Sequence, residues 1–366
     1  MKTNWQTQKL GDILKLEYGK PLPKSKRDVN GKYPVYGANG EKERSNDFYF
    51  DKPSIMVGRK GSAGELNLTE EKFWPLDVTY FVTFDEKKYD LKFLYDLLIT
   101  LELPRLAKGV KPGLNRNEVY AIEVEVPTLA EQRRLVKILD EVFEKVATAK
   151  ENAEKNLQNS KELFESYART AFENPGSWST KPLGEVCNLY QGIAINAKTR
   201  HALVEKSELP LLRIKDLKNN TVEQYIDPNN YPKNALVVES DLIYTRTGQI
   251  GLVFTGKRGV LHNNSFKIEP NHSLSREYLF HWLQNPTFKS KIISLASRAA
   301  QPDITHTLFK QQLIAIPSLP EQKAIVKKLN TLSVETKKME NIYEQKLADL
   351  DELKKSVLKK AFAGEL

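Results

Sequence analysis

The chain has 366 residues, a formal net charge of +9 at pH 7, and 40% hydrophobic and 28% charged residues. This length allows two or three domains, and the apolar and charged fractions are those of ordinary soluble proteins. No apolar run approaches the ~20 residues of a membrane span, and the N-terminus lacks a signal-peptide pattern. The single cysteine excludes an intramolecular disulfide framework, argues against structural zinc and suits a reducing cytoplasm.

The positive charge is concentrated in one part of the chain. Residues 175–317 carry 17 basic and 11 acidic side chains, a net +6 of the total +9. A basic balance of this kind indicates a polyanionic partner.

Residues 1–127 are predicted to form a mixed α/β domain. Strand-like runs and one helix with apolar periodicity alternate with glycine-rich loops. The expected strands are Ser54–Val57, Val78–Val82 and Ala121–Val126, and the expected helix covers about Leu91–Leu101. The glycine-rich run at 58–64 reads G-R-K-G-S-A-G, and we expect it to form a turn whose glycines adopt positive φ.

Residues 128–174 are predicted to form one long helix. Thr128 followed by Glu131 has the spacing of a capping box, and a proline precedes it. Apolar residues then recur at helical spacing, and the N-P-G run at 174–176 terminates the helix.

Residues 175–317 repeat the order of the first domain, and residues 318–366 repeat its helix. The run L-I-Y-T-R-T-G-Q-I-G at 242–251 matches the first glycine-rich turn at an offset of 187 residues, and Leu313–Ile316 closes the domain. The second helix starts with Ser318 and Glu321, an offset of 190 residues that persists to its end without a gap. The prediction is therefore a tandem repeat of two globular α/β domains and two long helices that pair as a coiled coil, since helices of ~65 Å are rarely stable alone.

No catalytic signature is present in the sequence. The run at 58–64 is neither a P-loop nor a G-x-G-x-x-G dinucleotide site. The N-P-T-F run at 285–288 has part of the pattern of amino-methyltransferases, but it lacks the second proline and lies in helix-like sequence, which favours a helix break. Pro302-Asp303 has no nuclease motif behind it, and the five histidines lack metal-ligand spacing. The pattern is that of a binder rather than a catalyst.

The whole chain resembles the specificity (S) subunits of type I restriction–modification systems. The resemblance is carried by the two helix starts P-x-L-x-E-Q-[RK]-x-[LI]-V at 127–136 and 317–326, and by the glycine-rich segments at 53–64 and 241–251. It implies two target-recognition domains, 1–127 and 175–317, each reading half of a split, asymmetric site in double-stranded DNA. It implies an antiparallel pair of spacer helices, 128–174 and 318–366, that sets the distance between the half-sites and docks two methyltransferase (M) subunits.

The resemblance also implies a division of chemistry among subunits. The specificity subunit would be non-catalytic and bind no cofactor itself, S-adenosylmethionine would belong to the methyltransferase subunits, and restriction (R) subunits would use ATP and Mg²⁺. Two alternatives remain at this stage: a structural coiled-coil protein without a nucleic-acid role, and a stand-alone DNA methyltransferase or nuclease.

Candidate DNA contacts are basic and amide side chains on the predicted loops. Arginine and lysine suit guanine, and asparagine and glutamine suit adenine. The candidates are Asn39, Arg59, Lys60, Lys108, Lys111, Asn115 and Arg116 in the first domain, and Arg213, Lys215, Arg246, Gln249, Lys257, Arg258, Arg298 and Gln301 in the second. For any one of them a solvated surface charge is an equally good interpretation. Arg59 and Arg246 match across the repeat, so each could instead be a scaffold residue that pairs with a carboxylate.

Overall fold

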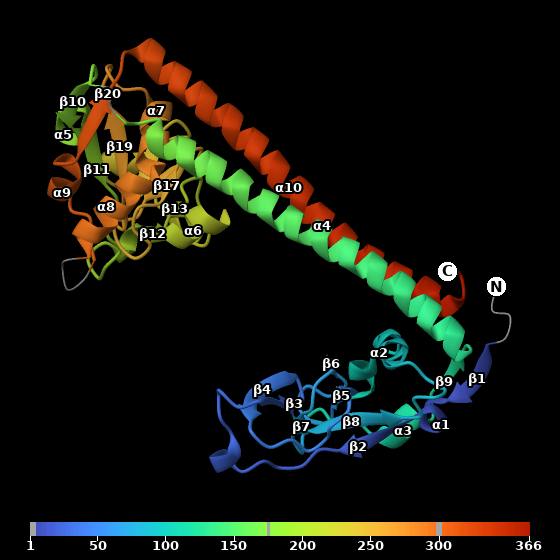
Figure 1. Cartoon of the computed structure of the whole chain (residues 1–366). Helices are drawn as coiled ribbons and strands as arrows, with labels where there is room; N and C mark the ends of the chain where they lie inside the picture. The colour runs from blue at the N-terminus through green and yellow to red at the C-terminus, as the bar shows by residue number, and fades with distance from the viewer. Residues whose placement is uncertain (1–4, 174–175, 298–301) are drawn as a thin grey trace. The chain divides into compact units, whose positions relative to one another are not determined.

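The computed structural model describes residues 5–173, 176–297 and 302–366. Its contacts divide the chain into two compact units (Figure 1). The first unit is Met1–Glu154 with Gln345–Leu366, and the second is Lys155–Glu344. Each unit therefore contains one globular domain and a part of each long helix. Among the described residues, no helix is both long enough and apolar enough to cross a bilayer.

The domain of the first unit is built on two small sheets and one strand pair. The four-stranded antiparallel sheet has the order β2 (Leu14–Tyr18), β8 (Thr79–Phe84), β5 (Ser54–Gly58), β6 (Leu66–Thr69). The three-stranded sheet has the order β4 (Gly40–Ser45), β3 (Tyr33–Gly37), β7 (Trp74–Pro75), and β1 (Gln6–Lys9) pairs with β9 (Glu123–Val126). The helices are α1 (Leu10–Ile13), α2 (Leu91–Thr100), α3 (Arg116–Tyr120) and the short 3-10 turns η1 (Lys24–Lys26) and η2 (Leu103–Leu106).

The domain of the second unit repeats this topology. Its four-stranded sheet has the order β11 (Cys187–Gln191), β19 (Ser265–Pro270), β16 (Leu242–Thr245), β17 (Val253–Phe254). The remaining strands are β13 (Leu211–Leu212), β18 (Gly259–Leu261) and β15 (Leu236–Val237) in one sheet, and the pairs β10 (Ser179–Pro182) with β20 (Leu313–Ile316) and β12 (Leu203–Val204) with β14 (Tyr225–Ile226). The helices are α5 (Leu183–Val186), α6 (Ile214–Asn219), α7 (Arg276–Gln284), α8 (Pro286–Ala296), α9 (His306–Lys310), η3 (Arg200–Ala202) and η4 (Lys233–Ala235).

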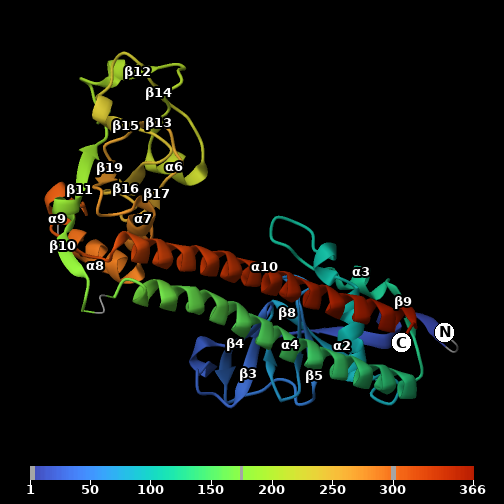
Figure 2. The same cartoon turned by 90° about the horizontal axis from the view of Figure 1, so that it is seen from above.

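The two long helices are α4 (Leu129–Thr170) and α10 (Leu319–Ala363), and they run side by side in both views (Figures 1 and 2). In the first unit Lys150 Nζ lies 2.6 Å from Asp351, and Lys354 Nζ lies 4.8 Å from the centre of the Phe143 ring. Moving backward along α4 thus moves forward along α10, which makes the pair antiparallel. The second unit has the same sense, because Lys328 Nζ lies 4.6 Å from the Tyr167 ring. The predicted mixed α/β tandem with paired antiparallel helices is confirmed.

Each hydrophobic core includes side chains from both long helices. In the first unit, Leu135 and Leu139 of α4 and Leu358 and Ala361 of α10 are buried together with the sheet and α2. In the second unit, Val326 and Leu329 of α10 and Phe172, just after α4, join the core of α7 and the second sheet. Because each core needs residues from both helices, a domain is fixed rigidly to the helix pair beside it.

A buried glutamine at the start of each long helix ties the helix to its domain. Gln132 is fully buried; its side-chain oxygen accepts from the Asp90 amide (2.9 Å), and its nitrogen donates to the carbonyls of Lys88 (3.1 Å) and Pro127 (2.9 Å). Gln322 makes the same three bonds, to the Ser275 amide (2.8 Å) and to the carbonyls of Ser273 and Pro317 (both 2.9 Å). The glutamine of the repeated E-Q pair therefore links each helix to the loop before α2 or α7.

Only the glutamate half of the capping box is present in the described residues, and only at the second helix start. The Glu321 carboxylate accepts from the Ser318 amide (2.8 Å) and hydroxyl (2.7 Å). In the first copy, the Glu131 carboxylate instead accepts two bonds of 2.8 Å from Arg134. The predicted bond from the Thr128 amide to Glu131 is therefore wrong in the part of the chain described here. Arg134, almost one turn further along α4, competes for the Glu131 carboxylate, whereas Ala324 occupies the equivalent position in the second copy.

We expect Gln132→Leu to loosen the first unit and Gln322→Leu to loosen the second. Each change leaves one buried amide and two buried carbonyls without their partner, at a cost of about 2–5 kcal/mol. Hydrogen-exchange mass spectrometry should show faster exchange at 88–94 in the first variant and at 273–279 in the second. Gln158→Leu, at an exposed position of α4, is the matched control. Wild-type exchange in both segments would show that these bonds do not hold the domains.

Candidate nucleic-acid interface

Two loops of the first domain, which we call loop pair 1, lie against each other at one end of the four-stranded sheet. They are the turn after β5, residues 58–64, and the segment before α3, residues 108–116. The Leu114 amide donates to the Arg59 carbonyl (2.9 Å), the Gly61 amide donates to the Pro112 carbonyl (3.0 Å), and Lys60 forms a β-bridge with Gly113. Backbone hydrogen bonds therefore hold together two loops that were predicted separately, from the sequence, to contact DNA.

The second domain builds loop pair 2, residues 245–251 and 302–305, with two of these three contacts. The Ile304 amide donates to the Arg246 carbonyl (3.0 Å), and Thr247 forms a β-bridge with Asp303. Residues of the first loop in the two domains correspond at an offset of 187, and residues of the second loop at an offset of 190. With these offsets, both contacts of loop pair 2 correspond to contacts of loop pair 1. Asn115 and Thr305 then cap α3 and α9 at equivalent positions.

Glycine at two matched positions makes the β5 and β16 turns possible. Gly61 and Gly64 have φ of +82° and +86°, and Gly248 and Gly251 have +71° and +81°. A side chain is strained in this region, so the sequence-based expectation of a turn with positive φ is confirmed. In both turns the last glycine amide bonds back across the turn, Gly64 to Gly58 (2.7 Å) and Gly251 to Thr245 (3.0 Å).

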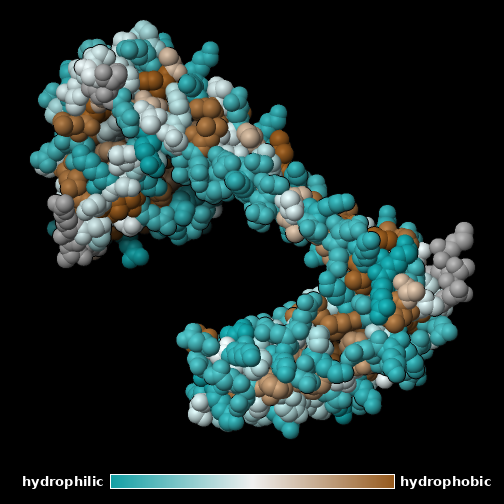
Figure 3. Space-filling model, viewed as in Figure 1, coloured by the Kyte–Doolittle hydropathy of each residue, from teal (hydrophilic) through white to brown (hydrophobic). Residues whose placement is uncertain are grey.

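Loop pair 1 carries most of the candidate residues of the first domain. Lys60 and Lys111 are exposed, and Asn115 is exposed although its side chain caps α3. Lys108 is also exposed, but its ammonium lies 2.9 Å from Glu118. Asn39 lies in the two-residue turn between β3 and β4, outside loop pair 1. The face of this domain visible in Figure 3 is largely hydrophilic.

Arg59 and Arg116 share one aromatic neighbour. Their guanidinium carbons lie 5.2 Å and 4.9 Å from the centre of the Tyr18 ring, at the end of β2. Tyr18 in turn packs edge-on against Tyr80, with ring centres 5.1 Å apart. Burial, and next the hydrogen bond with Tyr18, raises the pKa of Tyr80 to about 12, so this phenol stays neutral.

In loop pair 2 the matching arginine is neutralised. Arg246 Nε donates to Asp303 Oδ1 (2.9 Å), and a second guanidinium nitrogen bonds the other carboxylate oxygen. The alternative that Arg246 pairs with a carboxylate is therefore confirmed in the second domain, while Arg59 has no such partner among the described residues. His306, at the position of Arg116, is pressed edge-on against Phe266, and burial followed by the Arg246 charge lowers its pKa.

Other candidates of the second domain belong to segments outside loop pair 2. Arg213 pairs with Asp216 (2.6 Å) and Glu223 (3.1 Å), and Lys215 also pairs with Glu223. These two cations lower the pKa of the Glu223 carboxyl, with Lys215 contributing first. Lys257 donates to the Asn220 side chain (2.7 Å).

Two further candidates of the second domain are exposed, and two fall outside the described structure. Gln249, in the turn after β16, and Arg258 are the exposed ones. Arg298 and Gln301 lie outside the described residues. Contact of every candidate residue with DNA remains a prediction.

Sequence reasoning missed Tyr18, Tyr80 and Asp303 as members of these sites. Tyr18 ends the run L-K-L-E-Y, in which buried Leu14 and Leu16 alternate with polar residues. An exposed aromatic residue at the end of such a strand was the available signal. Asp303 was considered only as part of a nuclease motif, and nothing local in the sequence relates it to Arg246, 57 residues earlier.

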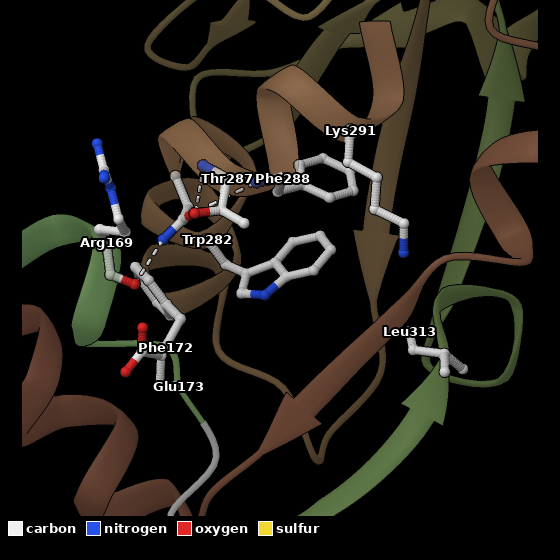
Figure 4. Close-up of a pocket in the computed structure, with 9 residues that line it drawn as sticks. Arg169, Phe172, Glu173, Trp282, Thr287, Phe288, Lys291 and Leu313 are labelled. Carbon is white, nitrogen blue, oxygen red and sulfur yellow. Dashed lines mark hydrogen bonds between the residues drawn. The ribbon is translucent and has the colours of Figure 1, made fainter. Parts of the chain in front are cut away.

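The N-P-T-F run is a helix break, as the sequence favoured. The Asn285 oxygen caps α8 by accepting from the amides of Thr287 (2.8 Å) and Phe288 (3.2 Å). Its nitrogen donates to the carbonyls of Ala168 (2.7 Å) and Arg169 (3.2 Å), at the end of α4. Figure 4 shows the bonds with Thr287, Phe288 and Arg169 beside a hollow, about 210 Å³ in volume, that is lined by Trp282 and Phe288. The amide of Asn285 is thus occupied by the backbone and not free to bind an adenine.

The described residues contain no group of three or more His, Cys, Asp or Glu side chains arranged to hold a metal ion. Two α/β domains with equivalent loop pairs, joined by a helix pair, define a protein that presents two related but different binding surfaces.

The family model of the type I restriction modification DNA specificity domain matches the chain twice, over residues 2–158 and 175–347. The chain therefore belongs to this family, with two copies of its domain in tandem. It is 24% identical to the type I restriction enzyme EcoDI specificity subunit of Escherichia coli, over the whole of this chain and 89% of that protein. It is 23% identical to a putative type I restriction enzyme specificity subunit of Haemophilus influenzae, over 84% of this chain and 81% of that protein.

Solved structures share the fold. The HsdS subunit from Thermoanaerobacter tengcongensis aligns with a TM-score of 0.66 at 18% identity, over all of this chain and 98% of that one. A chain from a study of complex assembly and conformational transition of the type I R-M system aligns with a TM-score of 0.77 at 18% identity, over all of this chain and 99% of that one.

We expect Lys111→Ala to weaken DNA binding by the assembled complex and to lower the slope of log K against log salt by about one, because one phosphate contact is lost. Lys108→Ala should have a smaller effect, because Glu118 already offsets that charge. Fluorescence anisotropy with a fluorescent duplex at several salt concentrations measures both. If neither variant changes the affinity or the slope, the 108–116 loop does not touch DNA.

Proposed function

We propose that the chain is the sequence-recognition subunit of a type I restriction–modification complex and that each domain reads one half of a bipartite, asymmetric DNA site. The observation that carries the proposal is the duplicated loop pair. Two contacts between the loops are equivalent in loop pairs 1 and 2, and an arginine, Arg59 or Arg246, is common to both, whereas Gly113 and Arg116 in one are replaced by Asp303 and His306 in the other. One scaffold with two different sets of side chains suits two different base sequences.

The helix pair would set the distance between the half-sites and dock two methyltransferase subunits. Each core draws on both helices, which supports a fixed relation between a domain and the helices next to it. S-adenosylmethionine would be bound by the methyltransferase subunits, and ATP and Mg²⁺ by the restriction subunits, as the resemblance to type I specificity subunits implies. A DNA target implies that the complex acts in the cytoplasm.

Replacement of residues 1–127 by another domain of this family tests the two-reader proposal. Methylome sequencing of cells that carry the chain with its methyltransferase should give a bipartite motif, and the replacement should change one half only. A change in both halves would contradict independent reading. Methylation by this chain without a partner would instead revive the stand-alone methyltransferase, and absence of salt-dependent DNA binding by the complex would favour a structural coiled-coil protein.

Insertion of four residues after Asn156 tests the role of the helix pair. Asn156 is exposed, and four residues add roughly one helical turn, ~6 Å, so the apolar stripe nearly returns to register. At ~3.4 Å per base pair, we expect the spacer of the methylated motif to lengthen by about one or two base pairs while both half-sites stay the same. An active insertion variant with an unchanged spacer would show that the helices do not set the distance.

A further inference from the structure

Tyr18 carries an exposed ring at the edge of loop pair 1, and the structure holds this ring firmly. Its side chain is 46% exposed, but Tyr80, which is almost fully buried, packs against it edge-on at 5.1 Å. Tyr18 also ends β2, where it is paired in register with Tyr80 on β8. The ring is therefore a fixed platform on the protein surface rather than a mobile side chain.

Two cations use this platform, and each comes from a different loop. Arg59 follows β5 and Arg116 is the first residue of α3, and the bond between the Leu114 amide and the Arg59 carbonyl holds the two loops together. Both guanidinium carbons lie within 5.2 Å of the Tyr18 ring centre. An aromatic face contributes about 0.5–1 kcal/mol to such a contact at an exposed site and restricts the flexible arginine.

Neither arginine has a carboxylate at ion-pair distance in the portion of the chain that the structure describes. This differs from loop pair 2, where Arg246 is bound to Asp303. The residue matching Asp303 is Gly113, which cannot supply a counter-charge. The site in loop pair 1 thus presents two uncompensated positive charges, where loop pair 2 presents a neutralised arginine and the half-buried ring of His306.

A planar guanidinium can make two parallel hydrogen bonds either with a phosphate or with the O6 and N7 atoms of guanine, whereas a lysine meets a phosphate as a point charge. Loop pair 1 also contains Lys60 and Lys111, which are exposed and can neutralise phosphates. The two oriented guanidiniums are therefore available to read a base edge.

We propose that Tyr18 is a specificity-determining residue of the first domain: it orients Arg59 and Arg116 to read guanine in the half-site that this domain recognises. The proposal rests on the proposed function, and it makes the two domains chemically different at equivalent positions. Tyr18 acts through the arginines, so it is a positioning residue, and its loss changes which bases are accepted.

The test is methylome sequencing of cells expressing the full chain with its methyltransferase, for wild type, Arg59→Lys, Arg116→Lys, Tyr18→Ala and Tyr18→Phe. The wild-type half-site assigned to residues 1–127 by domain replacement should contain a G·C pair. Each lysine variant keeps the positive charge but loses the planar guanidinium that can make two parallel hydrogen bonds with guanine. Discrimination between G·C and the other base pairs at that position should therefore fall roughly tenfold or more. Tyr18→Ala should relax the same positions, Tyr18→Phe should retain the wild-type motif, and the other half-site should not change.

Lys87→Gln is the matched control, since it removes one positive charge in the turn beyond the opposite end of β8, and the strand from Tyr80 to Phe84 alone rises about 13 Å. It should leave the motif unchanged. A first half-site without a G·C pair, an unchanged base preference in either lysine variant, or a uniform loss of methylation at all sites with Tyr18→Ala would overturn the proposal. Absence of any bipartite motif in wild type would instead contradict the proposed function itself.

Discussion

The structure depends on a buried side-chain amide at the start of each long helix. Gln132 and Gln322 are fully buried, and each satisfies two backbone groups of the loop before α2 or α7 and the carbonyl of the proline before its own helix. Because unpaired buried polar groups are costly, the domain cannot shift along its helix without breaking these bonds. A recognition loop placed on such a domain keeps a fixed position relative to the helix start.

The repeat explains how one fold can serve two recognition tasks. The glycines with positive φ and the backbone bonds between loops are kept in both domains, so the position of the loop pair is a property of the scaffold. The side chains are free to differ: Gly113 leaves Arg59 uncompensated, whereas Asp303 at the same place neutralises Arg246. The arginine is thus unpaired in the domain with glycine at this position and ion-paired in the domain with aspartate there.

Much of the architecture was predictable from the sequence because it is encoded locally. The strands at 54–57 and 242–245, the helix at 91–101 and the two helix starts all follow from periodicity and turn residues, and the structure places them within a few residues of expectation. Loop pairs 1 and 2 were nominated correctly as loops. The partners of their side chains were not predictable, because contacts such as Arg59 with Tyr18 or Arg246 with Asp303 join residues 41 and 57 positions apart. The prediction of a capping box at Thr128 was wrong for a related reason. Arg134 competes for the Glu131 carboxylate, and the spacing of Thr128 and Glu131 alone does not reveal this competitor.

The central claim is that each domain meets DNA through its own loop pair. The most direct measurement is a high-resolution structure of the assembled complex on a duplex that carries its methylated motif. We predict that loop pair 1, residues 58–64 and 108–116, lies in a groove of the DNA at one half-site. Loop pair 2, residues 245–251 and 302–305, should lie in a groove of the DNA at the other half-site. DNA bound to another face of either domain, with its loop pair in solvent, would contradict it.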